Sequence, residues 1–408
     1  MTANTNIGLL LSNKIDRTKF ITSLLSDQCP TEFSYLNQLK GLLFSSDAIE
    51  DMIELELRHD VLNISDRPLQ SFSSGERKKK FLQYLLHKKP DYLILDTAFD
   101  HLDPNSKLAL TNTLSEYLKK VHFIQIENRK KNFLPFITTR YEIKDNSFQI
   151  SKIENLEEKQ HQLSLNALPK LKSNFHLEGE KMIVFKSVCV SYEQRPIVKD
   201  ICWTINKGDF WQLIGPNGSG KSTLLSLITG DNPKGYGQDL YIFGRKRGSG
   251  ESVRSIKKHI GYYNPILAEM FWRYQTLEQM ILSGFYDSVG LYVNPTSLHK
   301  KIASDWLTIL GLSTLKNTPY SQLSQGLQRV TLIVRAFIKQ PPLLILDEPL
   351  EGLDEEAVTL VCDLINRLVK ETNTTIIYVS HQAEKRINPK AIFNLTPTKE
   401  GSLGNVVY

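Results

Sequence analysis

Apolar runs long enough to cross a membrane are missing from this sequence. No stretch of the 408 residues approaches the roughly 20 consecutive apolar residues that a membrane-spanning helix needs. Residues 1–16 have neither the basic segment nor the cleavage site of a secretory signal. We therefore expect a cytoplasmic protein, and any action at the plasma membrane is expected to come from a peripheral position at its inner face.

Cysteines are few, and they are widely spaced. The four are Cys29, Cys189, Cys202 and Cys362. No two of them have the spacing of a metal site, so the pattern predicts core thiols in a reducing compartment. Charge of one sign is not in large excess either. The net charge of +6 permits an anionic partner without requiring one.

The length and the pattern of short apolar segments predict two α/β domains. We place them at residues 1–150 and 181–408, joined by a polar linker over residues 151–180. Buried parallel strands are predicted at Ile7–Leu11, Tyr92–Leu95 and His122–Ile126 in the first half, and at Phe210–Ile214, Leu343–Leu346 and Thr375–Val379 in the second. Alternating apolar residues between Met182 and Asn206 predict additional antiparallel strands in the second domain.

A glycine-rich loop follows the predicted strand Phe210–Ile214. Its sequence is GPNGSGKST, and the residues predicted to contact phosphate are Gly215, Pro216, Asn217, Gly218, Ser219, Gly220, Lys221, Ser222 and Thr223. Glycines let backbone N–H groups approach phosphate oxygens, and the helix expected to begin at Lys221 adds its positive end. Lys221 would supply a charge to the phosphates, and the Ser222 hydroxyl would ligate Mg²⁺.

Two carboxylates end the next buried strand of the second half, in the segment LLILDEP. Burying such a pair is costly unless a cation or hydrogen-bond donors are present. Asp347 is predicted to hold Mg²⁺ through water, and Glu348 to orient the attacking water. His381 follows the predicted strand Thr375–Val379, and we interpret it as a γ-phosphate contact.

These elements, in this order, resemble the nucleotide-binding domain of ATP-binding cassette (ABC) proteins. The resemblance covers almost the whole chain, once in each half, and implies two P-loop NTPase-like domains with ATP and Mg²⁺ as ligands. It implies that Tyr192 stacks on adenine and that Leu323–Leu327 form a signature loop, with Asp354 on a loop that crosses to the partner domain. The stretches Asp239–Gly261 and Leu332–Asp354 are similar to the tandem ABC ATPases associated with molybdate transport.

In the ABC family each ATP lies between the phosphate loop of one domain and the signature loop of the other. The resemblance therefore implies head-to-tail pairing of the two halves and a composite site that combines the second half's loop, Asp347, Glu348 and His381 with the first half's signature. That signature consists of Ser73, Ser74, Gly75 and Glu76. Every role in this composite site is filled, so we expect it to hydrolyse ATP.

The opposite composite site lacks most of its parts. The first half has no glycine in Ser12–Phe20, where its phosphate loop should be. Lys14 or Lys19 alone cannot replace the backbone N–H groups with which a glycine-rich loop surrounds phosphate. Thr97 stands where the water-orienting glutamate belongs, and Asn128 or Arg129 stands where the histidine belongs. The opposing signature has Leu327 at a position usually held by Gln or Glu. We expect this site to be catalytically dead and the shortened first domain to act as a scaffold that presents Ser73–Glu76.

One departure concerns the coupling to a transporter. Pro265 occupies the place of a glutamine that touches Mg²⁺ in ABC transporters, and either Asn264 or Glu269 could substitute for it. The aromatic run Met270–Tyr292 is interpreted as core in preference to a docking patch.

We therefore predict a tandem ABC ATPase that drives or regulates an ABC transporter, with a membrane permease as partner and a molybdate-related importer as the leading candidate. The alternative is a soluble ABC ATPase acting on a nucleic-acid or ribosomal partner. A nucleic-acid partner is disfavoured, because the linker is too short for the charged arm of the ribosome-acting relatives and the zinc-binding cysteines of the DNA-repair relatives are absent.

Overall fold

The computed structural model describes residues 6–12, 15–26, 29–58, 67–99, 102, 104–143, 150–152, 167–169, 171, 179–265, 270, 274–381 and 383–407. Two compact units divide the chain. The N-terminal unit is Met1–Lys159 together with Gly352–Glu355, and the C-terminal unit is Gln160–Glu351 together with Glu356–Tyr408. Most of the predicted linker, including residues 153–166 and 172–178, lies outside the described residues.

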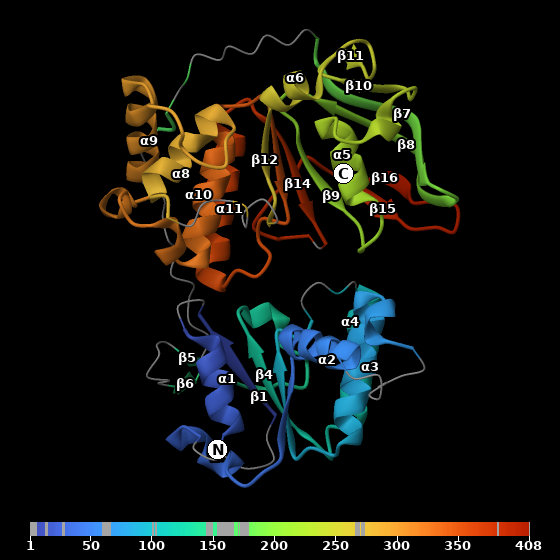
Figure 1. The fold of residues 1–408 in the computed structure, drawn as a ribbon, viewed down its shortest axis with the longest axis vertical. Helices are drawn as coiled ribbons and strands as arrows, with labels where there is room; N and C mark the ends of the chain where they lie inside the picture. Colours follow the sequence, from blue (N-terminus) through green and yellow to red (C-terminus); the bar gives the residue numbers. More distant parts are fainter. Residues whose placement is uncertain are drawn as a thin grey trace. The chain divides into compact units, whose positions relative to one another are not determined.

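A mixed sheet forms the centre of the N-terminal unit (Figure 1). Its strand order is β2-β3-β4-β1-β5-β6. The strands are β1 (Ile7–Leu11), β2 (Gly41–Phe44), β3 (Tyr92–Asp96), β4 (His122–Glu127), β5 (Thr139–Ile143) and β6 (Ile150–Lys152). Only the edge pair β5–β6 is antiparallel. The predicted strand Ile7–Leu11 is confirmed, and two others are longer by one residue.

Helices cover both faces of this sheet. They are α1 (Arg17–Leu25), α2 (Ser46–Arg58), α3 (Ser74–His87) and α4 (Pro104–Glu116), with 3-10 turns at Thr31–Leu36, Leu69–Ser71 and Lys130–Asn132. Along β1 the side chains alternate between two cores: Leu9 packs in a cluster with Phe20 of α1, and Leu10 in a cluster with Phe81 of α3. The unit is therefore a three-layer α/β domain.

The main sheet of the C-terminal unit repeats this topology. Its order is β12-β13-β14-β9-β15-β16, and the strands are β9 (Phe210–Ile214), β12 (Ile260–Tyr263), β13 (Leu343–Asp347), β14 (Thr375–Ser380), β15 (Ala391–Thr396) and β16 (Leu403–Val407). Again only the last pair, β15–β16, is antiparallel. The matching orders make β9 the counterpart of β1, β13 that of β3 and β14 that of β4.

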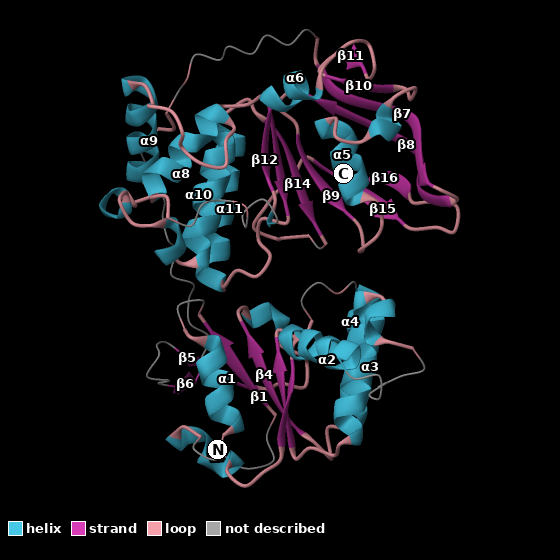
Figure 2. Ribbon diagram, in the orientation of Figure 1, coloured by secondary structure: helices cyan, strands magenta, loops and turns pink. Residues whose placement is uncertain are grey.

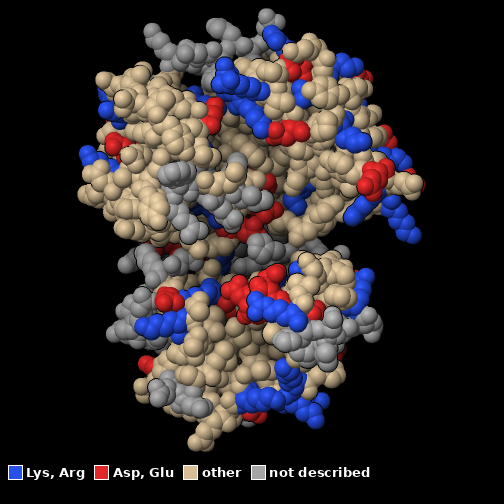
Figure 3. Space-filling view, in the orientation of Figure 1, with Lys and Arg blue, Asp and Glu red and all other residues tan. Residues whose placement is uncertain are grey.

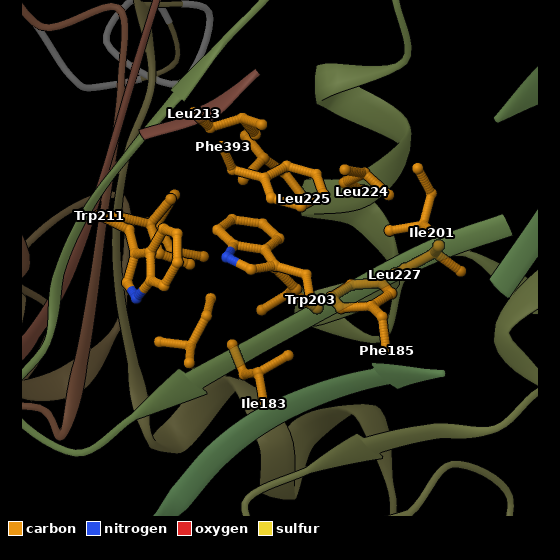
Figure 4. Packing of buried hydrophobic residues seen from close by; sticks show 14 of the residues in the cluster. Ile183, Phe185, Ile201, Trp203, Trp211, Leu213, Leu224, Leu225, Leu227 and Phe393 are labelled. Carbon is orange, nitrogen blue, oxygen red and sulfur yellow. The ribbon is translucent and has the colours of Figure 1, made fainter. Parts of the chain in front are cut away.

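The C-terminal unit also carries a four-stranded antiparallel sheet, as the alternating pattern predicts. It consists of β7 (Lys181–Tyr192), β8 (Arg195–Asn206), β10 (Leu240–Ile242) and β11 (Arg245–Lys246), in the order β11-β10-β7-β8. Trp203 ties the two sheets together, because its ring stacks on Phe393 of β15 with centroids 4.4 Å apart (Figure 4). Among the described residues of the N-terminal unit there is no counterpart of this sheet.

The helices of the C-terminal unit are α5 (Lys221–Thr229), α6 (Val253–Lys258), α8 (Leu277–Ser283), α9 (Ser297–Ile309), α10 (Gln325–Phe337) and α11 (Glu355–Glu371) (Figure 2). Short 3-10 turns lie at Pro233–Gly235, Gly284–Tyr286, Ser313–Leu315 and Tyr320–Gln322. The edge of Trp306 meets the face of Phe337 at 5.8 Å, which joins α9 to α10.

Two expectations from the sequence need correction. Of the four cysteines only Cys362 is buried, whereas Cys189 and Cys202 are exposed on the long β-hairpin and Cys29 is half-buried. The run Met270–Tyr292 is core only in part: α8 is buried, but Tyr274 is 88% exposed and Tyr292 62%. Within the described residues no helix has the length and apolar character required to cross a bilayer.

Candidate functional site

The glycine-rich loop lies between the end of β9 and the start of α5, which begins at Lys221 as predicted. Gly220 is the N-cap residue of α5 and has a φ of +93°. A Cβ atom at this position would lie 2.6 Å from Cγ1 of Val198, so only glycine fits. The Ser219 hydroxyl in the same loop is buried and has no hydrogen-bond partner among the described residues. The loop therefore holds a donor that a bound anion could satisfy.

Lys221 points back across this loop. Its Nζ donates to the carbonyl oxygen of Gly215 at 2.7 Å and of Pro216 at 3.2 Å, and it lies 3.2 Å from Nδ1 of His381. Burial lowers the pKa of Lys221, and the charges of Glu348 and Asp347 oppose this effect. The ammonium group is thus poised between backbone carbonyls and the acidic end of β13.

Glu348 follows directly after β13 in an unusual backbone conformation. Its φ is +50°, which is uncommon for a residue with a side chain, and its N–H donates to the Val379 carbonyl at 3.0 Å. This turn directs the carboxylate toward His381, whose Nε2 lies 2.6 Å from Oε1 of Glu348. The structure thus brings together Lys221, Glu348 and His381, three of the residues predicted for catalysis.

The two adjacent carboxylates differ in their electrostatic surroundings. Burial and then repulsion from Glu348 raise the pKa of Asp347 from 3.8 to about 6. Burial also acts to raise the pKa of Glu348, but hydrogen bonds from His381 and Glu351 outweigh it and lower this pKa to about 2. Glu348 is therefore the ionised partner near neutral pH, while Asp347 carries a charge that its surroundings disfavour.

A cavity of about 530 Å³ opens in front of the loop. Its lining consists of Arg195, Ile197, Asn217, Gly218, Ser219, Gly220, Lys221, Ser222, Thr223, Asn264, Pro265, Asp347, Glu348 and Glu351. The predicted adenine contact, Tyr192, does not belong to this lining. It lies on the same β-hairpin as Arg195; the residue is 44% exposed, and its hydroxyl accepts a hydrogen bond from Asn232 at 2.8 Å.

Three lining residues concern points that the sequence left open or did not raise. Asn264 lies in the cavity wall beside Pro265, whereas the alternative, Glu269, lies outside the described residues. Glu351 was not predicted, although its carboxylate, that of Glu348 and a ring nitrogen of His381 all lie within 4.8 Å of one another. Arg195 was also missed, because nothing in its local sequence links the hairpin to the distant loop.

A half-buried arginine fixes the turn that carries Glu348. Arg329, on α10 after the signature residues, donates to the carbonyl oxygens of Glu348 at 3.2 Å, Pro349 at 3.1 Å and Glu351 at 3.0 Å. Three hydrogen bonds from one rigid guanidinium define the path of this segment better than one ammonium group could. Arg329 is thus a positioning residue that the sequence analysis did not single out.

The predicted signature of the N-terminal unit begins a helix. Ser73 is the N-cap of α3, and it forms a capping box with Glu76, whose Oε2 accepts from the Ser73 backbone N–H at 3.1 Å. Hydrogen bonds from Ser73 lower the pKa of Glu76. A Cβ atom on Gly75 would lie 2.4 Å from Oγ of Ser106 on α4, so glycine permits this helix contact. Ser73, Ser74 and Glu76 are all exposed.

The chain is similar to known ATP-binding proteins. A family described as "ABC transporter" matches residues 198–351. The ABC transporter ATP-binding protein ModF of Escherichia coli (strain K12) is 37% identical over 355 residues, which are 81% of this chain and 71% of that protein. The chain belongs to the ABC ATP-binding protein family. An uncharacterized ABC transporter ATP-binding protein of Schizosaccharomyces pombe is 29% identical over 326 residues, 78% of this chain and 66% of the relative.

One solved structure extends the likeness in fold over nearly the whole chain. It is that of an archaeal ribosome recycling factor, aABCE1, in complex with the ribosomal stalk protein aP1. The TM-score is 0.62 at 14% identity, covering 98% of this chain and 85% of that one. At such low identity the likeness shows the fold alone. The fold is thus that of P-loop NTPase-like ABC domains, as predicted.

As an ABC protein, the chain binds ATP and is an ABC-type ATPase. Its residues also fit Mg²⁺, because the carboxylate of Asp347 is half-buried and disfavoured as an anion, and Asp347 and Ser222 line the same cavity. A hard cation with oxygen ligands would relieve the charge on Asp347 and neutralise charge on the phosphates. Asp347 and Ser222 would hold it.

Proposed function

We propose that this chain is the ATPase component, or a regulator, of an ABC transporter and works through one competent ATP site. The observation that carries the proposal is the linked set Lys221, His381 and Glu348, of which Lys221 and Glu348 line the loop cavity. In the N-terminal unit the corresponding ends of α1, β4 and β3 hold Arg17, Asn128 and Thr97. Thr97 cannot perform the role proposed for Glu348, since a threonine hydroxyl cannot act as a carboxylate base.

We place the competent site between the glycine-rich loop of the C-terminal unit and the signature Ser73–Glu76 of the N-terminal unit, in head-to-tail pairing. Ser73 caps a helix of 14 residues, α3, whose N-terminus favours anions. Its exposed position leaves it accessible to a phosphate group. Because both units belong to one chain, the tether raises the effective concentration of the signature.

In the proposed reaction Glu348 orients and activates the attacking water. Its carboxylate is ionised at neutral pH and so can accept a hydrogen bond from that water, and the backbone turn held by Arg329 fixes its direction. His381 would contact the γ-phosphate from the position it already occupies beside Lys221. Lys221 would exchange its contacts with the Gly215 and Pro216 carbonyls for phosphate oxygens. Asn264 is the candidate for the glutamine that Pro265 replaces.

A membrane permease is the proposed partner, and molybdate or a related oxyanion is the proposed cargo of the transporter. The support is the similarity of Asp239–Gly261 and Leu332–Asp354 to molybdate-associated tandem ATPases, together with a relative named as an ABC transporter ATP-binding protein. Lys and Arg occur together with Asp and Glu on the visible face of each unit (Figure 3). Such mixed charge gives no support to a nucleic-acid partner.

Equilibrium binding to the Glu348→Gln protein with Mg²⁺ tests the number of competent sites. We expect one tightly held ATP per chain, and two would overturn the one-site proposal. The partner is tested by fractionating cells that express the same trapped variant. Enrichment in the membrane fraction with ATP supports the transporter role, and enrichment with ribosomes would replace it by the ribosomal alternative.

A further inference from the structure

The N-terminal unit contains a partly buried cation at the place that corresponds to Lys221. Arg17 is the first residue of α1, the helix that follows β1, just as Lys221 is the first residue of α5 after β9. Because β1 and β9 occupy the same position in sheets of the same strand order, the two helix starts are equivalent. Lys14 and Lys19 are the other basic residues of this segment, but Lys14 lies outside the described residues and Lys19 lies two residues beyond the helix start.

The Arg17 guanidinium is held on three sides. Its Nε donates to Oδ1 of Asp96 at 2.5 Å, and a second nitrogen forms an ion pair with the same carboxylate. A further nitrogen donates to the side-chain oxygen of Asn128, and the Ile126 carbonyl accepts at 3.2 Å. The side chains of Arg17 and Asp96 are 25% and 14% exposed, so the pair is largely shielded from water.

The partners of Arg17 are the equivalents of the residues around the competent loop. Asp96 ends β3 as Asp347 ends β13, and Asn128 follows β4 as His381 follows β14. Thr97 also repeats the conformation of Glu348: its φ is +43° against +50°, and its N–H donates to the Ile126 carbonyl at 3.0 Å. The local backbone conformation is therefore the same in the two units, whereas the side chains on it differ in their chemistry.

A second feature closes the same place to anions. Asp16 is the N-cap of α1, and its carboxylate accepts a hydrogen bond from the Lys19 N–H at 3.0 Å. By contrast, helix α5 of the C-terminal unit has Gly220 as its N-cap and no hydrogen bond from a capping side chain. An anionic side chain at the helix start uses an N–H group that a phosphate would need, and it repels the phosphate charge.

We propose that Arg17 is a built-in counter-ion that replaces nucleotide and metal in the N-terminal unit, and so holds this unit in one conformation whether or not ATP is present. Asp96 then needs no metal ion, because two guanidinium nitrogens already contact its Oδ1 and neutralise its charge. Asp16 excludes the phosphate. Only the C-terminal unit would respond directly to nucleotide. This inference deepens the proposed single competent site but is tested separately from it.

Hydrogen exchange of the full-length Glu348→Gln protein, followed by mass spectrometry with and without Mg²⁺–ATP, provides the test. Two equivalent turns are compared: the peptide containing Thr97 and the peptide containing Glu348 itself, changed here to Gln. We expect ATP to slow exchange in the second and to leave the first unchanged. Slower hydrogen exchange in the Thr97 peptide on adding ATP, together with binding of two ATP molecules per chain, would overturn the proposal.

The role of Arg17 is tested by Arg17→Met in the same full-length protein. We expect exchange around Thr97 to become about fivefold faster or more and the unfolding midpoint of the unit to fall by about 5 °C or more, with no recovery on adding Mg²⁺–ATP. Arg58→Met is the matched control, because Arg58 and Glu54 form an exposed pair in the same unit, with side chains 72% and 67% exposed. That change should leave both measurements as they were.

A double variant distinguishes the counter-ion role of Arg17 from a role of its side chain in packing alone. Adding Asp96→Asn to Arg17→Met should recover part of the lost stability, since it removes the carboxylate that lost its counter-ion. Independent, additive losses would contradict the counter-ion role, even if Arg17→Met alone failed to fold. Loss of the one-site stoichiometry without any change at Thr97 would instead count against the proposed function alone.

Discussion

Asp96 and Asp347 end equivalent strands of two sheets with the same topology, yet their charges are balanced in opposite ways. Asp96 holds the guanidinium of Arg17. Asp347 has Glu348 as a neighbour, and burial together with this repulsion raises its pKa to about 6. One carboxylate is thus neutralised within the protein, and the other is left for a ligand to neutralise.

The first prediction is that removing these two charges has opposite effects on stability. Between pH 3.8 and about pH 6 the native state binds more protons at Asp347 than the unfolded chain does. The destabilisation that the ionised Asp347 causes therefore grows as pH rises through this window and is complete above it. Asp347→Asn should therefore raise the free energy of unfolding of the nucleotide-free protein by up to about 3 kcal/mol near pH 8. The gain should shrink toward about pH 4.

Asp96→Asn is the matched comparison in the N-terminal unit. It breaks the pair with Arg17 and should lower the free energy of unfolding by about 1–3 kcal/mol at the same pH. Urea unfolding of the two variants, with one probe in each unit, measures both effects. Destabilisation of similar size by both substitutions would contradict the contrast drawn between the two carboxylates.

A second prediction concerns the water-activating carboxylate. Glu348→Gln keeps the shape of the side chain but removes the base, so ATP hydrolysis should fall by about 10²–10⁴-fold while ATP binding is retained. Steady-state hydrolysis and equilibrium binding on the same preparation measure the two properties. Equal loss of both would assign Glu348 to binding and not to the chemical step.

The third prediction concerns serine-to-arginine substitutions at the starts of two helices. Ser73→Arg places a bulky side chain at the N-cap of α3, which we propose faces the competent loop, and ATP hydrolysis should fall to near background. Ser324 is the N-cap of α10 and accepts from the Leu327 N–H at 3.4 Å. Ser324→Arg should change hydrolysis little, because the loop opposite this signature is proposed to be incompetent. Hydrolysis assays on the pair decide, and equal losses would remove the one-site account.

The fourth prediction concerns the arginine that holds the Glu348 turn. Arg329→Lys keeps the charge but cannot maintain all three carbonyl contacts, so Glu348 should be less well placed. We expect kcat to fall roughly tenfold with little change in KM, since the loop that binds the phosphates is untouched. Arg254→Lys on the exposed surface of α6 serves as control. A rise in KM with unchanged kcat would indicate a role in binding instead.

Local sequence was sufficient for the elements whose structure depends on neighbouring residues. The largely apolar run Phe210–Ile214 became β9 with the predicted bounds, and the helix after the glycines begins at Lys221. Burial drives such apolar runs into the sheet centre, and glycines permit the tight turn before the helix. The same reasoning did not find Glu351 or Arg195, because a residue enters a cavity wall through contacts between segments far apart in the chain.

The sequence by itself determined the ABC family, the phosphate loop and the degeneracy of the first half, since each follows from residue types at fixed spacings. Only the tertiary structure decided what replaces the lost loop. Arg17 lies 79 residues from Asp96 and 111 from Asn128, and strand order alone brings the three together. Physical proximity across a parallel sheet is set by topology and not by spacing, so no local pattern could have shown that an arginine neutralises the site.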